Sequence, residues 1–146
     1  MRAMIDIATV PEDEVAITRE VAGRQDIPQA FLTKIVQRLA QAGLLEAQRG
    51  AHGGVRLARP AAEINLRQII EAMEGPVFLN YCLIRPGECS RENTCPIHDV
   101  WLEAQEKLLE TLEKCTLAYL AERSKEVCTK QIGQASQRRL ERGNRK

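Results

Sequence analysis

The chain has 146 residues, enough for one domain with a modest core and an extension. Hydrophobic residues make up 44% of it and aromatic residues only 3%, so the core must be mainly aliphatic, which favours packed helices over a β-sandwich. No apolar run is long enough to span a membrane, and the first residues lack the pattern of a signal peptide. We therefore expect a cytoplasmic protein.

Charge is spread unevenly, although the formal net charge is only +1. Residues 19–59 hold seven basic and three acidic side chains, and residues 124–146 hold seven basic and two acidic ones. Local basic surface attracts phosphate even where the overall charge is near zero. In a reducing compartment, the five cysteines indicate metal or redox chemistry rather than a disulfide framework.

The first part of the chain predicts three helices. We expect them at 2–10, at 18–24 with Thr18 as N-cap, and at 28–42, where Pro28 can begin a helix without losing a hydrogen bond. The third helix has one apolar face at helical spacing and an opposite face that is polar, small and lightly charged. The apolar face comprises Phe31, Leu32, Ile35, Val36 and Leu39, and the polar face comprises Gln29, Ala30, Thr33, Lys34, Gln37 and Gln41.

A hairpin and a short helix are expected next. Two extended segments at 44–49 and 55–59 flank the glycine-rich turn 50–54, which is typical of a β-hairpin. An amphipathic helix is expected at 66–74, and the Gly-Pro pair at 75–76 ends it.

The last part of the chain predicts a loop, a long helix and a tail. Residues 77–96 show no period, and Asp99 can cap a helix running to about residue 123. At 1.5 Å per residue this helix would span roughly 37 Å, more than one small protomer can cover, so we expect a homodimer. We expect residues 124–146 to be a basic, disordered tail. The stripe of the long helix consists of Trp101, Ala104, Leu108, Leu112, Cys115 and Tyr119.

The order helix, turn, helix and hairpin is typical of a DNA-binding head. A rigid helix with short polar side chains can enter a major groove. Arg49, Arg56 and Arg59 beside the glycine turn can contact phosphates, and an arginine or His52 can reach the minor groove. The alternative is a helical hairpin with a solvated polar face, but the attached wing favours DNA binding.

A second constellation is Cys82-x6-Cys89-x5-Cys95-x2-His98. Three thiolates and an imidazole can converge on one centre, and such soft ligands select an iron–sulfur cluster or zinc. Structural zinc sites usually pair ligands two residues apart, as only Cys95 and His98 are here, so the longer spacings favour a cluster. Of the other candidates, we expect Cys115 to be a core residue, Cys128 a free thiol and His52 a surface residue.

Both constellations, in this order and separation, resemble the Rrf family of bacterial winged-helix transcriptional regulators, which includes IscR and NsrR. The resemblance covers most of residues 2–123. The matching stretches are IPQAFLTKIVQRL at 27–39, GLL at 43–45, RGAHGG at 49–54, IIEAMEG at 69–75, the three cysteines and TLAYL at 116–120.

The resemblance implies a mainly α fold: a winged helix-turn-helix domain with a two-strand wing and a long C-terminal dimerisation helix. It implies that each recognition helix enters a major groove and that each wing enters a minor groove of double-stranded DNA with a palindromic operator. The cluster would be 2Fe–2S, as in the IscR branch, where a histidine three residues after the last cysteine is the fourth ligand, or 4Fe–4S, as in nitric-oxide-sensing relatives. The implied DNA-binding residues are Gln29, Ala30, Thr33, Lys34, Arg38, Arg49, His52, Gly53, Gly54 and Arg56, and the implied metal ligands are Cys82, Cys89, Cys95 and His98.

Two departures from the family pattern matter. Six residues rather than five separate Cys82 from Cys89, which leaves the subfamily open. The family normally begins with a short basic segment and the first turns of helix one, whereas Met1 falls inside that helix, so we expect a truncated N-terminus.

The domain division expected is a DNA-binding domain at 1–75, a cluster-binding loop at 76–98, a dimerisation helix at 99–123 and the tail at 124–146. The function expected is a regulator, most simply a repressor, whose operator affinity responds to iron–sulfur status, redox poise or nitric oxide through the cluster. The alternatives are a cluster-free or zinc-stabilised regulator that responds to a thiol metabolite or partner protein, and a ferredoxin-like electron carrier. Enzymatic hydrolysis is not expected, because neither histidine has an evident nucleophile beside it.

Overall fold

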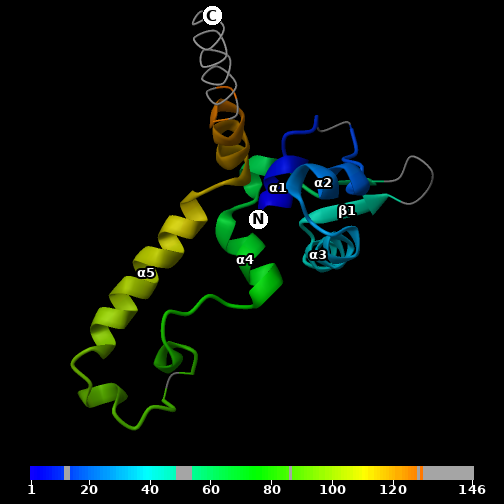
Figure 1. Ribbon diagram of the computed structural model, residues 1–146. Coiled ribbons are helices and arrows are strands. Elements are labelled where there is room, and N and C mark those ends of the chain that lie inside the picture. Colours follow the sequence, from blue (N-terminus) through cyan, green and yellow to red (C-terminus); the bar gives the residue numbers. More distant parts are fainter. Residues whose placement is uncertain (12–13, 49–53, 86, 128, 130–146) are drawn as a thin grey trace, which may run out of the picture.

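The computed structural model describes residues 1–11, 14–48, 54–85, 87–127 and 129. They form a mainly helical protein with one two-stranded sheet (Figure 1). The head consists of α1, α2, α3 and the sheet; α4 lies beside it, and α5 with the preceding loop extends away. The elements are α1 (Arg2–Ile7), α2 (Thr18–Gln25), α3 (Gln29–Gln41), β1 (Leu45–Gln48), β2 (Gly54–Leu57), α4 (Leu66–Glu74), α5 (His98–Lys114), three single 3₁₀ turns (Ala61–Glu63, Tyr81–Leu83, Glu92–Thr94) and a C-terminal helix over residues 117–127.

The core lies inside the head and is almost entirely aliphatic. Its most deeply buried side chains come from every element of the head, from α4 and from the C-terminal helix. The low aromatic content is therefore met by interlocking Leu, Ile, Val and Met side chains, as expected. These side chains are Met4, Val21, Leu32, Leu39, Leu44, Val55, Ile64, Ile69 and Leu117.

The helix-turn-helix predicted from the sequence is present. Asp26 ends α2 in the left-handed conformation, with φ at 51°, and the Ile27 amide donates to the Ala22 carbonyl at 2.9 Å. This tight turn reverses the chain into α3, which buries Leu32, Val36 and Leu39 against the core.

The wing is an antiparallel pair in which Glu46 lies opposite Arg56. A short bridge pairs Ala16, ahead of α2, with Val55 of β2. A Cβ on the neighbouring Gly54 would lie 2.5 Å from the Ala16 carbonyl oxygen, so only glycine allows this close approach. The bridge fixes the base of the wing to the helix-turn-helix.

Helix α4 has the bounds predicted from the sequence. The Asn65 side chain accepts from the Gln68 amide at 2.9 Å and Gln68 accepts from the Asn65 amide at 3.1 Å, which makes a complete capping box. Gly75 ends the helix with φ at 84°.

The single long helix predicted over 99–123 is wrong, because the chain breaks at Cys115. The Leu66 amide donates to the Cys115 carbonyl at 2.8 Å and the Leu117 amide donates to the Ile64 carbonyl at 2.7 Å. This pairing turns Leu117 into the core, where it is 0% exposed. A new helix then starts with the Thr116 hydroxyl accepting from the Tyr119 amide at 3.2 Å.

Five smaller predictions are also corrected. Ile97, not Asp99, is the N-cap of α5, which begins at His98. Residues 124–127 are helical and not disordered, and α1 ends at Ile7, with residues 8–10 forming a turn. Ile17, not Thr18, precedes the first turn of α2 as its N-cap. Phe31, predicted to be buried, is 58% exposed.

Candidate nucleic-acid interface and cysteine loop

The outward face of α3 presents the side chains predicted to read bases. Gln29, Ala30, Thr33 and Lys34 are all exposed. The Thr33 hydroxyl donates to the Gln29 carbonyl at 2.9 Å, so it is already engaged within the helix. The first turn of α3 carries no acidic residue that would repel phosphate.

Arg38, also predicted to contact DNA, joins α3 to α4. Its Nη1 donates to the Met73 carbonyl at 3.0 Å, one residue before the last of α4. A guanidinium on a helix C-terminal carbonyl satisfies a group that the helix leaves unpaired. The recognition helix is therefore tied to the end of the helix that leads into the cysteine loop.

Of the wing residues predicted to bind DNA, Gly54 and Arg56 are among the described residues and the others are not. Arg56 donates from Nε and Nη2 to Glu46 Oε2 at 2.9 and 2.7 Å across the strand pair, so its charge is partly neutralised. Gly54 serves the close approach of the chain at Ala16, which is a packing role. Arg49, His52 and Gly53 lie outside the described residues, and their contribution stays a prediction.

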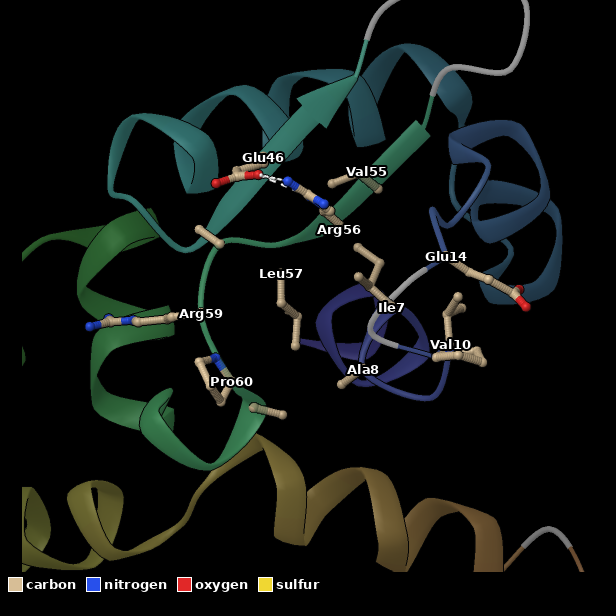
Figure 2. A pocket seen from close by; sticks show the side chains of 13 residues that line it. Ile7, Ala8, Val10, Glu14, Glu46, Val55, Arg56, Leu57, Arg59 and Pro60 are labelled. Carbon is tan, nitrogen blue, oxygen red and sulfur yellow. Dashed lines mark hydrogen bonds and ion pairs between the residues drawn. The ribbon is translucent and has the colours of Figure 1, made fainter.

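A cavity of about 270 Å³ lies between the end of α1 and β2. Figure 2 shows Ile7, Ala8, Val10 and Leu57 turned toward one another, with the Arg56–Glu46 pair nearby; the side chain of Arg59 extends away from them. The cavity lining also includes the charged residues Glu14, Glu46, Arg56 and Arg59.

The cysteine loop joins α4 to α5 at the end of the molecule far from the head (Figure 1). Cys82 lies in the turn Tyr81–Leu83, and Cys89 and Cys95 flank the turn Glu92–Thr94. All three are free thiols; Cys89 is exposed and the other two are half-buried.

The donor set suits a soft metal centre, but the four predicted ligands are not gathered at one point. Within the described part of the chain, no three His, Cys, Asp or Glu side chains are close enough to hold a metal ion. His98 lies at the start of α5, and its Nε2 is 3.9 Å from Glu92 Oε1. Three thiols and an imidazole therefore share one irregular segment, and their convergence requires that segment to rearrange.

Gln105 of α5 anchors the first part of this loop. Its Nε2 donates to the Val77 carbonyl at 2.7 Å, and its Oε1 accepts from the Leu79 amide at 2.8 Å. Gln105 is the buried polar residue of the described chain, at 9% exposure. The Gln105 side-chain amide thus pairs with the backbone of this segment as a neighbouring β-strand would, through one donated and one accepted hydrogen bond.

Helices α4 and α5 are also joined at their other ends. Arg67 donates from Nε to Glu71 at 2.9 Å and from Nη1 to Glu113 of α5 at 2.5 Å. The hydrogen bonds to Glu71 and then Glu113 raise the pKa of Arg67 above its ordinary value. The loop therefore leaves and re-enters a pair of helices that are fixed to each other.

The whole of residues 1–123 matches the family described as Rrf2, iron-dependent transcriptional regulator. The chain belongs to the Rrf2 family. An HTH-type transcriptional regulator of Mycobacterium tuberculosis, Rv1287, is 33% identical over 122 residues, which cover 83% of this chain and 75% of that protein. This is a family of transcriptional regulators.

Two solved structures of similar proteins share the winged-helix fold. IscR of T. potens superposes with a TM-score of 0.65 at 26% identity, covering 86% of this chain and 82% of that one. CymR of B. subtilis, named as the global cysteine regulator, superposes with a TM-score of 0.68 at 24% identity, covering 82% and 87%. In the described residues, no helix is long and apolar enough to cross a membrane.

Sequence reasoning missed two features of the site. Gln105 lies four residues after Trp101 and three before Leu108. This helical spacing places it on the apolar stripe and therefore indicates that it is buried. The contact of Arg38 with Met73 joins residues 35 apart, and no local pattern indicates it.

Proposed function

We propose that this Rrf2-family regulator is a dimeric DNA-binding repressor whose operator affinity is controlled by an iron–sulfur cluster on the cysteine loop. The observation that carries the proposal is that the cysteine loop is connected through α4 to the recognition helix α3. The loop with three thiols and an imidazole begins directly after α4, and the end of α4 is hydrogen-bonded to the recognition helix through Arg38.

The DNA-reading part of the proposal places α3 in the major groove. Its exposed Gln29, Ala30, Thr33 and Lys34 face the base edges, and the wing follows the flanking minor groove. A rigid head supports this role, because the Ala16–Val55 bridge fixes the wing to the helix-turn-helix. Two such heads related by a two-fold axis favour a palindromic operator.

The dimer part of the proposal rests on α5. Ile97, Val100 and Leu102, at or just before its start, are 50%, 58% and 48% exposed, and its apolar stripe from Trp101 to Leu112 is only half-buried. In the described part of the chain, α5 packs mainly against α4, the turn Tyr81–Leu83 and residues 77–79, and it extends away from the head. A second copy of α5 is the natural cover for this surface.

Cys82, Cys89, Cys95 and His98 would hold the cluster, with 2Fe–2S favoured and 4Fe–4S as the alternative. When bound, a cluster supplies a redox-active and chemically labile crosslink among these ligands. The protein contributes a loop in which these four ligands could be brought together. Gln105 holds residues 77–79 against α5 while the thiols lie beyond this anchor.

A conformational change in the cysteine loop can be transmitted to the DNA-reading head through α4 and Arg38. Residues 77–79 follow α4 directly, and Arg38 joins the Met73 carbonyl of α4 to α3. A ligand shifts such an equilibrium only by its differential affinity for the two conformations, which is typically about 1–3 kcal/mol for coupled sites.

Anaerobic purification tests the cofactor directly. The proposal predicts a brown protein with stoichiometric iron and acid-labile sulfide, with an absorption and EPR signature that Cys89→Ala abolishes. Cys115→Ala is the matched control, because Cys115 lies outside the loop and should leave the signature unchanged. Colourless protein with neither iron nor sulfide would contradict the cluster.

The competing function is a cluster-free or zinc-stabilised regulator that responds to a thiol metabolite or a partner protein. It is favoured by the similarity to CymR, which is named as a cysteine regulator, and by the separation of the thiols in the described loop. One zinc per chain, or an operator affinity that changes with added cysteine in metal-free protein, would support it.

A further inference from the structure

The first two turns of α3 expose apolar side chains as well as the polar Gln29. Ala30 is exposed, and Phe31 is 58% exposed although an aliphatic core lies directly behind the helix. Thr33 points outward, and its hydroxyl donates to the Gln29 carbonyl at 2.9 Å. With the hydroxyl hydrogen already bonded, Thr33 can offer a partner its methyl and its acceptor oxygen, but no donor.

These three groups are exposed in the first two turns of α3, the end of the helix that would enter the groove first. In a major groove, the N-terminal residues of a recognition helix contact base edges. Each base pair presents a distinct pattern there, and thymine alone presents an apolar group, its C5-methyl. Alanine, the threonine methyl and phenylalanine are the side-chain groups that contact it.

We propose that α3 reads thymine C5-methyl groups, with Phe31 as the main specificity-determining residue and Ala30 and the Thr33 methyl as further contacts. This inference rests on the proposed entry of α3 into the major groove and adds to it the chemical group that is recognised. It predicts an operator whose half-sites carry thymines beneath the N-terminal end of α3.

The distribution of charged residues along α3 is consistent with recognition of thymine methyl groups. The first turn carries no acidic residue, and the first basic residue after it is Lys34, one turn further on. A bidentate arginine or lysine contact to guanine therefore has no candidate in the turn that holds Phe31. Lys34 is placed to reach phosphate or a base further along the groove.

The test uses the full chain and two chemically matched DNAs. A duplex is first selected from a random-sequence library, and each thymine in its half-sites is then replaced by deoxyuridine, which removes only the methyl. Loss of one buried methyl should weaken binding about fourfold at the contacted position. Phe31→Ala should bind the thymine and deoxyuridine duplexes equally, and Phe31→Leu should retain part of the discrimination.

Phe78→Ala is the matched control, because Phe78 is a second exposed phenylalanine, at 40%, on the cysteine loop. It should keep the fourfold preference. Each comparison is a ratio within one variant, so partial unfolding cannot imitate the result. Equal binding of both duplexes by the parent chain, or an unchanged preference in Phe31→Ala, overturns the methyl readout while DNA binding stands. If no sequence is enriched at all, the proposed function fails as well.

Discussion

Replacing Gln105 by leucine should free the first part of the cysteine loop from α5. Leucine has a similar size but removes both hydrogen bonds, leaving the Val77 carbonyl and the Leu79 amide without their partner. Each bond contributes a net of about 0.5–1.5 kcal/mol, so the loop should open at a cost lower by about 1–3 kcal/mol. That corresponds to a population of opened loop roughly 5- to 150-fold higher.

Hydrogen exchange at the Leu79 amide measures this directly, because exchange reports local opening. The exchange rate should rise by the same factor in Gln105→Leu. Glu106→Leu, a change at the next and exposed position of α5, is the control and should leave Leu79 protected. The single tryptophan, Trp101, lies one turn before Gln105 and gives a fluorescence check that α5 itself remains folded. Unchanged exchange at Leu79 in Gln105→Leu would refute the anchoring role.

Three further predictions follow from the head. Leu117→Ala should lower the free energy of unfolding by about 2–5 kcal/mol in urea titrations, because the side chain is 0% exposed, while Val127→Ala at an exposed position should change it little. Gly54→Ala should destabilise by about 1–3 kcal/mol in the same assay, since its Cβ would lie 2.5 Å from a backbone oxygen. Gly23→Ala, with open space around it inside α2, should instead be neutral or stabilising, and equal effects for the two glycines would contradict the close approach. Lys34→Ala should weaken binding to all duplexes alike and reduce the salt dependence of log K by about one unit per half-site if it contacts phosphate; an unchanged slope assigns it to a base instead.

The parts of the fold that local sequence determines were predictable. The helices α3 and α4 have clear periodicity, and the glycine turn between two short extended segments indicates the wing. The break at Cys115 was not predictable in this way, because it depends on backbone pairing with residues 64–66, about fifty positions earlier in the chain. A helical stripe that continues through a break looks like one helix.

In the candidate site, too, local sequence predicts the residue types but not the contacts between distant segments. Cysteine spacing identifies a donor set but not its geometry, since the loop has no regular structure to fix the side chains. Phe31 falls on the apolar face by spacing, yet it is 58% exposed in the folded chain. The role of Arg38 depends on where α4 ends in space, and only the folded chain places Met73 beside it.

The central claim is that the state of the cysteine loop sets the affinity of α3 for DNA. Fluorescence anisotropy with the selected duplex can compare anaerobic protein carrying the cluster with the same protein after its iron is removed. The account predicts dissociation constants that differ by about 5- to 150-fold, with the difference narrowed in Arg38→Ala. Identical constants for the two forms of a protein shown to carry iron and sulfide would contradict it.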